Sequence, residues 1–510
     1  MKKNKKKMCT WLITMALGLA IVGCSNNKTT TTETTKQVET TAVDTSSSTT
    51  KGAYSDEDLN TSYSDSDTKI ELSNGSADIT GDGATFENGN IKITKAGTYV
   101  LSGEFDGQII TEVGDEDVVH LVFNGVNITN TTSSAINAAT GKKVVITLVD
   151  GTTNTLSDGT SYEYADGEDE PDATLFVKNN LTINGTGSLN IDSNYATAIK
   201  AKDNLIILDS KINIDSVVKA IKGKDSVTIE NADITINAED DGITTDGAMV
   251  INSGNINIEK SGEGLEGVSI DINGVNIDIV ATDDGINARG LIDDSATDAE
   301  KEAYGEENQA DTYLRITGGT VNINASADGI DSNGQVYIDG GTVYVSGATS
   351  GPDVALDYNG KAVITGGTFV STGVQEMAQT FDSSSTQNFI TVYYDSAVAA
   401  GSEIKVTDKD GNTVLSYNAD KEFTFAVISS DKLSTGETYT VTAGDNSNEV
   451  TITAGGNTIG ESSVAGPGGN GGPGGNPPTG QPPQKPTDAN GNEIEMQGPP
   501  SGESSQTEKN

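Results

Sequence analysis

The middle of the chain repeats a short pattern at a nearly constant interval. An apolar residue that follows a small one recurs at Ile199, Ile221, Ile243, Leu265 and Ile286, at intervals of 22, 22, 22 and 21 residues. A second register runs through Ile207, Ile229, Ile251 and Ile272, and a third through Ile214, Ile236, Ile258 and Ile279. A fixed period of this length is the signature of a solenoid.

Each period has the pattern of three short strands. Apolar and polar residues alternate in Val227-Thr-Ile229 and Ile234-Thr-Ile236, and glycine-rich turns such as Thr317-Gly-Gly-Thr320 separate the strands. Alternation with period two indicates strands with one buried face. Since no run is long enough for a helix, the pattern predicts an all-β fold, a parallel β-helix with about 22 residues per coil, and argues against leucine-rich or helical repeats.

The pattern extends in both directions if insertions are allowed. Upstream, Phe86, Ile109, Ile136 and Phe176 occupy equivalent positions, and downstream Ile330 and Leu356 do. Two insertions interrupt the period, an acidic one at 150–172 and another at 291–312. We therefore predict a β-helix over residues 67–385, with roughly twelve coils stacked about 4.8 Å apart in a rod of roughly 55 Å. Because each coil buries its apolar residues against its neighbours, 34% hydrophobic residues suffice.

Residues 386–456 break the period and predict a small antiparallel β domain. Its expected strands contain Phe389–Tyr393, Glu403–Val406, Phe423–Phe425 and Tyr439–Val441, with a hairpin turn at Asp410-Gly411. We expect this domain to cap the end of the β-helix, because an open end exposes unpaired strand edges. Residues 457–510, rich in Gly, Pro and Gln, form a disordered tail by composition.

The start of the chain has the features of a lipoprotein signal peptide. Five lysines precede a short apolar run, and Ile21-Val22-Gly23-Cys24 follows. This predicts removal of residues 1–23 and lipidation of Cys24. The run is too short for a membrane-spanning helix. The Thr- and Ser-rich residues 24–66 read as a solvated tether that lifts the folded part off the outer face of the cytoplasmic membrane, at the cell surface.

The net charge is −44, and about −49 after cleavage before Cys24, because the signal peptide holds five lysines and no acid. A surface this acidic repels phosphates and argues against nucleic acid as a partner. With one histidine and two cysteines in the chain, zinc and thiol chemistry is also excluded.

Acidic residues recur at one corner of successive coils. The position two residues before each apolar anchor holds Thr197, Lys219, Asp241, Glu263, Asp284 and Asp328. Asp240 and Asp283 precede two of these acids, and Asp246 and Asp331 lie just beyond the corner. Carboxylates stacked ~5 Å apart repel by about 1 kcal/mol in water and about 3 kcal/mol at an effective dielectric of 20. Such a column favours bound calcium, a hard cation with oxygen ligands.

Two alternatives stay open at this corner. Asp-Gly is good turn chemistry, so the acids can simply be solvated. Arg289 follows Asp283 and Asp284 closely, so it can act as the base of a calcium-assisted polysaccharide lyase, or merely pair with those aspartates.

Tyrosines of the last coils offer sugar-stacking surfaces. Tyr337, Tyr344 and Tyr358 are candidates, because tyrosine rings are stiff and amphipathic. The alternative is that one or more of them packs under the C-terminal domain. His120, in the alternating run Val118–Val122, is expected on the surface of a strand.

Several segments resemble a known family. They are Gly97–Gly103, Asn124–Thr129, Val145–Leu156, Asp169–Pro171 and Leu181–Gly187. Over roughly residues 67–455 the chain resembles bacterial surface lipoproteins described as carbohydrate-binding domain-containing proteins. The resemblance implies a right-handed parallel β-helix, shaped like pectate lyases, that binds calcium and either cellulose or acidic plant polysaccharides such as polygalacturonate, without established catalysis.

The Asp-Gly corner of this family matches Asp241-Gly242, Asp284-Gly285 and Asp328-Gly329. Thr197-Ala198 and Lys219-Ala220 depart from it, so those coils are not expected to hold calcium, and Lys219 is expected to neutralise Asp241.

The leading hypothesis is a lipid-anchored, monomeric, non-catalytic protein that holds acidic polysaccharide through calcium. A polysaccharide lyase and a structural stalk or adhesin that binds a protein are the alternatives. Fold alone does not decide among them.

Overall fold

A computed structural model describes residues 54–291, 305 and 307–463. The chain divides into two units, residues 1–48 and 49–510, and every described residue belongs to the second. Cys24, the signal peptide and residues 464–510 of the tail lie outside the described residues. No helix among the residues that the structure covers is long and apolar enough to cross a membrane.

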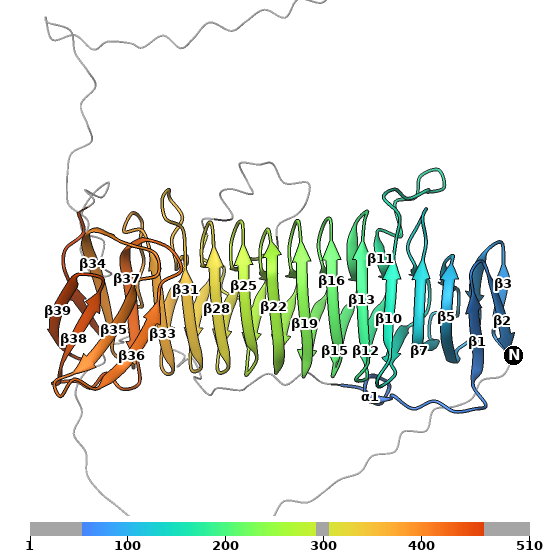
Figure 1. Cartoon of the computed structure of the whole chain (residues 1–510), viewed down its shortest axis with the longest axis horizontal. Helices are drawn as coiled ribbons and strands as arrows, with labels where there is room; N and C mark the ends of the chain where they lie inside the picture. The colour runs from blue at the N-terminus through green and yellow to red at the C-terminus, as the bar shows by residue number, and fades with distance from the viewer. Residues whose placement is uncertain (1–53, 292–304, 306, 464–510) are drawn as a thin grey trace, which may run out of the picture. The chain divides into compact units, whose positions relative to one another are not determined.

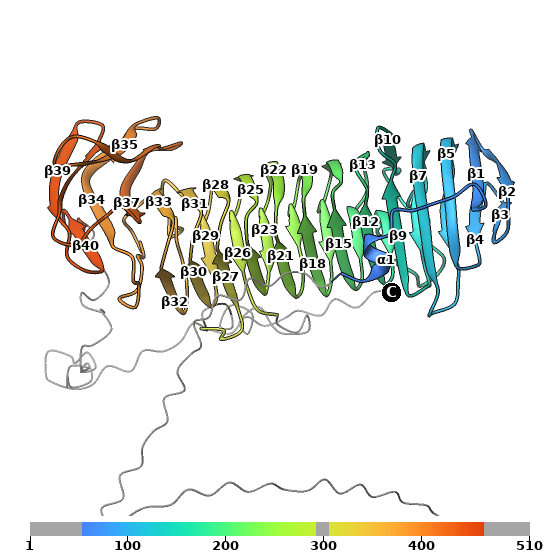
Figure 2. The same cartoon turned by 90° about the horizontal axis from the view of Figure 1, so that it is seen from below.

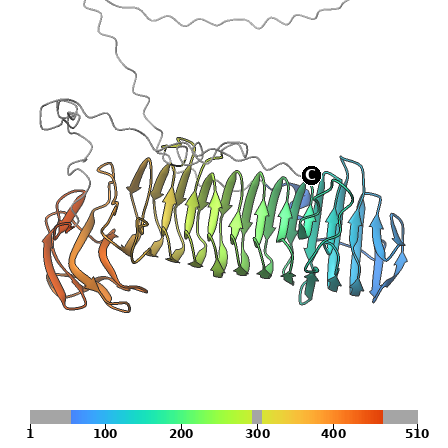
Figure 3. The ribbon, with the colours of Figure 1, turned by 90° about the horizontal axis from the view of Figure 1, so that it is seen from above.

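The described chain is built mainly from parallel strands that stack coil upon coil into three ladders (Figures 1 and 3). The first ladder is a separate sheet, seen along much of its length in Figure 2. Its strands are β3 (Ala84–Glu87), β4 (Asn90–Ile93), β6 (Ile109–Thr111), β8 (Ile136–Ala138), β11 (Ala173–Val177), β14 (Thr197–Ala201), β17 (Ile221–Gly223), β20 (Ile243–Thr244), β23 (Leu265–Gly267), β26 (Ile286–Ala288) and β29 (Ile330–Ser332).

The second and third ladders join through the long strand β7 (Val118–Thr129), which pairs with β9 in one and β10 in the other. The second ladder continues from β1 (Thr68–Ser73), β5 (Gly97–Asp106) and β7 through β9 (Lys143–Leu148), β12 (Asn180–Asn184), β15 (Asn204–Leu208), β18 (Ser226–Glu230), β21 (Ala248–Ile251), β24 (Ser269–Ile272), β27 (Tyr313–Ile316), β30 (Gln335–Ile338) and β32 (Lys361–Ile364). The third holds β10 (Thr153–Ser157), β13 (Ser188–Ser193), β16 (Lys211–Ser216), β19 (Ala232–Ala238), β22 (Gly254–Ser261), β25 (Asn276–Ala281), β28 (Thr320–Ala325), β31 (Thr342–Ser346) and β33 (Thr368–Gly373).

The register predicted from the repeat is confirmed strand by strand. In the first ladder Ile199 pairs with Ile221, and the pairing continues through Ile243, Leu265 and Ile286 to Ile330 and Leu356. The other two registers pair in the same way, as Ile207 with Ile229 and Ile214 with Ile236 show. All these side chains are buried, because inward positions of successive coils stack into one continuous apolar core.

Two upstream assignments are wrong. Leu175, not Phe176, pairs with Ile136 and Ile199. Every residue of β11 is buried, so this strand has no alternation from which its register could be read. Phe86 lies in β3, which pairs antiparallel with β4, and the parallel pairing of the first ladder begins at Ile91 with Ile109.

The first insertion is shorter than the predicted 150–172, because residues 153–157 form the paired strand β10. Residues 158–172 connect β10 to β11 as a loop. Ile286 pairs directly with Ile330, so the chain between them contains the second insertion, but residues 292–304 and 306 lie outside the described residues.

Residues 54–60, predicted as part of the tether, pack on the second ladder instead. Helix α1 (Asp56–Leu59) packs on β12 of the second ladder, where Asp58 is almost fully buried. Asp58 forms an ion pair of 2.7 Å with Lys143 Nζ and accepts a hydrogen bond from Thr182. Tyr54 OH donates to Glu230 Oε2 at 2.5 Å. The segment follows the outer face of the ladder because this buried carboxylate has both a charge partner and hydrogen-bond donors there.

His120 also differs from expectation. Its side chain is only 6% exposed, and its Nε2 lies 2.7 Å from Thr147 Oγ1. Burial lowers the pKa of the imidazole.

After the third ladder, the strand direction changes. β33 pairs antiparallel with β37, so its outer edge is covered. A separate antiparallel sheet has the order β36-β35-β38-β39, and a second apolar core lies beneath these strands. That sheet consists of β35 (Glu403–Asp408), β36 (Thr413–Asn418), β38 (Thr438–Ala443) and β39 (Asn446–Thr451). β34 (Phe389–Val398), β37 (Phe423–Ser430) and β40 (Gly456–Ile459) belong to the large sheet, so the predicted disordered tail does not begin at residue 457. At the N-terminal end of the second ladder, β1 pairs antiparallel with β2 (Ser76–Thr80).

Candidate functional site

The corner between the third and first ladders stacks the residues that the repeat predicts there. Backbone hydrogen bonds join each coil to the next, from Gly242 N to Glu263 O, from Gly264 N to Asp284 O and from Gly285 N to Asp328 O. Asp241, Glu263, Asp284 and Asp328 therefore form one column, which we call the corner column.

Close approach of neighbouring coils explains why glycine follows each of these acids. A Cβ atom on Gly285 would lie 2.2 Å from Ile323 Cγ2 and 2.5 Å from the carbonyl oxygen of Gly329. Both distances are far below van der Waals contact. The glycine lets the acid sit at the edge of the first ladder while the core isoleucine packs directly behind it.

A second column lies beside the corner column on the outer face of the first ladder. It contains the residue after each apolar anchor, and these residues are paired from coil to coil: Thr244, Glu266, Asn287 and Asp331. Only Asp331 of this face column was a predicted ligand. Glu266 and Asn287 were missed, although the register that placed Asp331 also places them.

The two columns together form two acidic clusters. The aspartate cluster consists of Asp284, Asp328 and Asp331, whose carboxylate oxygens can lie within 4.8 Å of one another. All three side chains are half-buried. Asp284 accepts a hydrogen bond from the backbone N–H of Asp328, and Asp328 accepts one from Val354.

The aspartate cluster has strongly perturbed acids. Burial raises the pKa of Asp284 to about 6, and the carboxylates of Asp283 and Asp353 add to the effect. Burial and the nearby Asp284 and Asp357 raise the pKa of Asp328 to about 8. Within the described residues, neither Asp284 nor Asp328 has a lysine or arginine at ion-pair distance. Burial and like charge thus oppose ionisation of Asp284 and Asp328, and a bound cation would stabilise their ionised forms.

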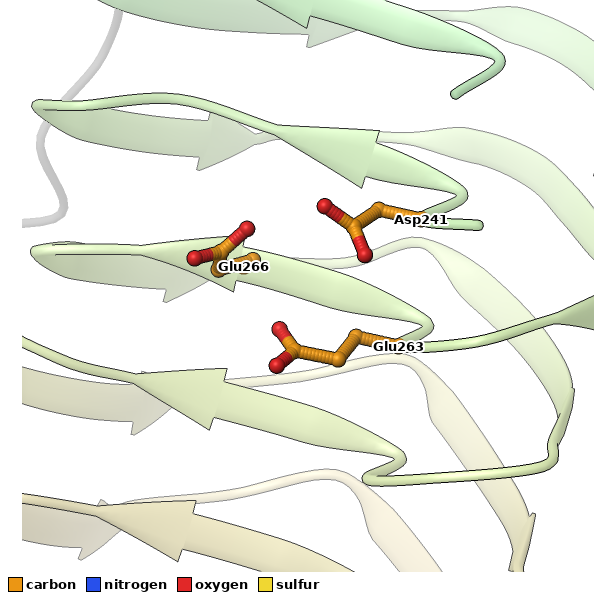
Figure 4. A group of neighbouring side chains, drawn as sticks. All are labelled: Asp241, Glu263 and Glu266. Carbon is orange, nitrogen blue, oxygen red and sulfur yellow. The ribbon is translucent and has the colours of Figure 1, made fainter. Parts of the chain in front are cut away.

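The cation-paired cluster consists of Asp241, Glu263 and Glu266, one to two coils earlier. Figure 4 shows the three carboxylates turned toward a common space. Lys219 forms an ion pair with Asp241, as the sequence predicted, and also with Asp240 at 3.1 Å. Arg289 forms an ion pair with Glu266.

Charges in the cation-paired cluster nearly balance at neutral pH. Burial raises the pKa of Glu263 to about 8, with help from Glu266 and Asp241, so this carboxyl keeps its proton at pH 7. Burial also raises the pKa of Asp241, although Lys219 opposes it. For Glu266, burial is outweighed by Arg289, and the pKa is lowered. Asp241 and Glu266 thus each have a cationic partner.

Arg289 does not pair with Asp283 and Asp284, contrary to the sequence-based alternative; its partner is Glu266. Although burial opposes its charge, Glu266 raises the pKa of the guanidinium further. A group that holds its proton this firmly is poorly suited to act as the base of a lyase.

Three predicted ligands lie outside both clusters. Asp240 is half-exposed and pairs with Lys219, and Asp283 is exposed. Asp246 forms an ion pair of 3.1 Å with Lys222.

The donor set fits a hard, oxygen-bound cation. Each cluster offers three carboxylates as ligands. Asn287, which is 7% exposed, lies between the clusters in the face column. Its Nδ2 donates to Glu263 Oε1 at 3.1 Å, whereas its buried Oδ1 has no hydrogen-bond partner among the described residues. Side-chain oxygens of this kind are ligands of calcium.

The three predicted sugar-contacting tyrosines do not share a surface. Tyr344 stacks on Tyr417 of β36 at 4.7 Å, so it packs under the C-terminal strands. Tyr358 OH donates to Thr380 O, and its ring packs against the core. Tyr337, on β30, lies 4.8 Å from the guanidinium of Arg315. They form no common stacking platform.

Comparison with known proteins gives three findings. The family model described as "Carbohydrate-binding domain-containing protein" matches residues 87–354. A protein of that description from Acetivibrio thermocellus is 38% identical over 135 residues, which are 26% of this chain and 47% of the relative, so the match spans about half the length of that relative. A solved structure described as the polysaccharide lyase-like protein from C. thermocellum, gadolinium derivative, is 29% identical and covers 59% of this chain and 97% of its own, with a TM-score of 0.36. The chain belongs to the family of carbohydrate-binding domain-containing proteins.

Proposed function

We propose that the chain binds acidic polysaccharide at the cell surface through calcium held by the aspartate cluster, without cleaving it. The observation that carries this proposal is the group of three convergent aspartates, two of which have raised pKa values and no cationic side chain within the described residues.

The residues Asp284, Asp328 and Asp331 would hold the ion, since they supply half-buried carboxylate oxygens from neighbouring coils. Calcium bound there supplies positive charge that a uronate carboxylate can share. This reconciles an acidic protein with an acidic ligand, because the net charge of −44 would otherwise repel it.

The family supports a carbohydrate as the ligand, and its description names carbohydrate binding. The aspartate cluster favours the polygalacturonate-like class, because a ligand with its own carboxylates gains most from a shared calcium ion. Cellulose lacks carboxylates, and any binding to it is expected to be independent of calcium.

Anchoring by lipid at Cys24 is part of the same proposal, and it rests on the signal sequence alone. It predicts incorporation of a labelled fatty acid into the chain expressed in a bacterial host, and loss of the label in Cys24→Ser. A Cys24→Ser chain that keeps the label would contradict it.

Retention on a polygalacturonate gel tests the binding proposal. The wild-type chain should be retained with calcium and should elute with a calcium chelator, and Asp328→Asn should pass through in both buffers. Asp283→Asn is a matched control, because it removes one exposed carboxylate beside the same corner but outside the cluster. Retention of the wild type that ignores the chelator would overturn calcium bridging.

The same assay separates binding from catalysis. Bound polygalacturonate should keep its length, and no ultraviolet absorbance from unsaturated uronate products should develop. Products that form with the wild type and disappear in Arg289→Ala would show a lyase instead.

A further inference from the structure

Lysines gather on the outer face of the first ladder, on the coils that precede the two acidic clusters. Lys200 and Lys222 are partners on β14 and β17, in the column that continues to Glu266 and Asp331. Lys202 and Lys224 follow two residues later on the same coils, and Lys178 occupies the matching position after β11. This lysine patch stands out in a chain of net charge −44.

The acidic loop at residues 158–172 supplies the carboxylates that meet Lys178, Lys200 and Lys202, whereas Lys222 pairs with Asp246. Glu170 forms an ion pair with Lys202 and lies 3.8 Å from Lys178 Nζ. Asp172 forms an ion pair with Lys200. The hydrogen bond that Lys202 donates to Glu170 raises the pKa of Lys202, so the lysine stays charged.

Aromatic contacts hold this loop over the coils. Tyr162 stacks on Tyr195 with ring centroids 4.4 Å apart, and its hydroxyl donates to Asp158 Oδ2 at 2.7 Å. Tyr164 OH donates to Pro171 O at 3.0 Å, next to both pairing carboxylates. The loop therefore presents Glu170 and Asp172 to the lysines from a defined position.

The pairing leaves charges incompletely matched. Lys224 is exposed and has no ion pair with any described residue. Asp172 Oδ1 is buried without a hydrogen-bond partner among the described residues. The paired side chains of Lys200, Lys202, Glu170 and Asp172 stay 18–36% exposed, so a ligand with several carboxylates can compete with the loop for the lysines.

We propose that the lysine patch is a second binding subsite for the uronate carboxylates of an acidic polysaccharide, and that Glu170 and Asp172 occupy it when no ligand is bound. This inference rests on the proposed function, because calcium at the aspartate cluster first brings the polymer to this face. Four coils separate Lys222 from Asp331, roughly 19 Å at the spacing of strands. One polymer chain of a few sugars spans both subsites.

The loop also explains how a lysine patch remains compatible with calcium dependence. A carboxylate tethered next to a lysine has an effective concentration in the millimolar range or above, so it excludes weakly bound ligands. The wild-type chain should then show no retention without calcium. Neutralising the loop carboxylates should expose direct, salt-sensitive binding.

The test compares two double variants on the polygalacturonate gel in chelator. Glu170→Gln/Asp172→Asn should be retained and should elute with salt, whereas the wild type passes through. Glu163→Gln/Glu168→Gln removes the same charge from exposed positions of the same loop that form no ion pair with a described lysine, and should behave like the wild type. Adding Lys200→Gln and Lys202→Gln to the first variant should abolish its retention.

A variant that leaves the charge unchanged separates release of the loop from a mere decrease in repulsion between the chain and the polymer. Tyr164→Phe removes the hydroxyl that bonds Pro171 and should give weaker retention in chelator by loosening the loop. A fully methyl-esterified polygalacturonate gel, which lacks free carboxylates, should retain none of these variants.

The proposal is overturned if both Glu170→Gln/Asp172→Asn and Tyr164→Phe, each with the wild-type thermal unfolding transition, pass through in chelator. Equal retention of the two double variants would overturn it as well. Neither result affects calcium bridging, which is judged by the wild type with and without chelator.

Discussion

The aspartate cluster and the cation-paired cluster are built from the same two columns of the same ladder, yet their charges are neutralised differently. In the cation-paired cluster, Lys219 and Arg289 pair with two carboxylates, and Glu263 keeps its proton. In the aspartate cluster, Asp284 and Asp328 have no cationic partner within the described residues. The repeat places acids in both clusters. The side chains of neighbouring coils decide whether these acids are neutralised from within the chain or by a bound cation.

The largest expected effect is on calcium affinity. Asp328→Asn removes a central carboxylate of the aspartate cluster and should weaken calcium binding by roughly 30-fold or more, measured by isothermal titration calorimetry. Glu263→Gln, the matched change in the cation-paired cluster, should alter the affinity less than about threefold, because Lys219 and Arg289 already pair with the neighbouring carboxylates of that cluster. The reverse order of the two effects would exchange the roles of the clusters.

A second prediction converts one cluster into the other. Lys219→Gln combined with Arg289→Gln removes both cations from the cation-paired cluster. Its carboxylates then have no ion-pair partner, like Asp284 and Asp328 of the aspartate cluster. We expect the calcium stoichiometry to rise by one ion per chain at pH 8, measured by equilibrium dialysis. An unchanged stoichiometry would show that cation pairing is not what distinguishes the clusters.

The pH dependence of stability gives a third prediction. Folded Asp284 and Asp328 have pKa values of about 6 and about 8, raised from 3.8, so the folded chain holds protons that the unfolded chain has released. Without calcium, the free energy of unfolding should therefore fall as pH rises from about 4 to about 8. Asp328→Asn should flatten the upper part of this decline in denaturant titrations.

Calcium separates the two clusters in the same experiment. Saturating calcium should remove the contribution of Asp328 to the decline, because the ion replaces the proton. The contribution of Glu263, whose pKa is about 8, should persist with calcium and disappear only in Glu263→Gln. Loss of both contributions on adding calcium would place an ion in each cluster.

The smallest effect concerns Asp240 and Asp283, which precede the corner column but lie outside both clusters. Either one changed to Asn should alter calcium affinity less than about threefold, because these side chains are largely solvated. A larger loss in Asp283→Asn would extend the aspartate cluster to this residue.

The repeat predicted the fold because a β-helix converts sequence spacing directly into spatial neighbours. Once Ile199, Ile221 and Ile243 were aligned, the corner acids followed. The prediction failed where this link breaks, at the uniformly buried β11 and at the antiparallel start of the first ladder.

The site was harder to predict, because its chemistry depends on contacts across coils and between distant segments. Glu266 and Asn287 lie outside the Asp-Gly pairs that marked the corner, although the same register places them. The pairing of Arg289 with Glu266 was not predicted, because it requires the arginine side chain to reach back to the preceding coil. The packing of Tyr344 on Tyr417 and of Asp58 on Lys143 joins residues that no period relates.

A crystal structure grown with calcium tests the central claim most directly. We predict an ion bound at about 2.3–2.6 Å to carboxylate oxygens of Asp284, Asp328 and Asp331, and no ion between Asp241, Glu263 and Glu266. An ion only in the cation-paired cluster, or none in either cluster at saturating calcium, would contradict the account.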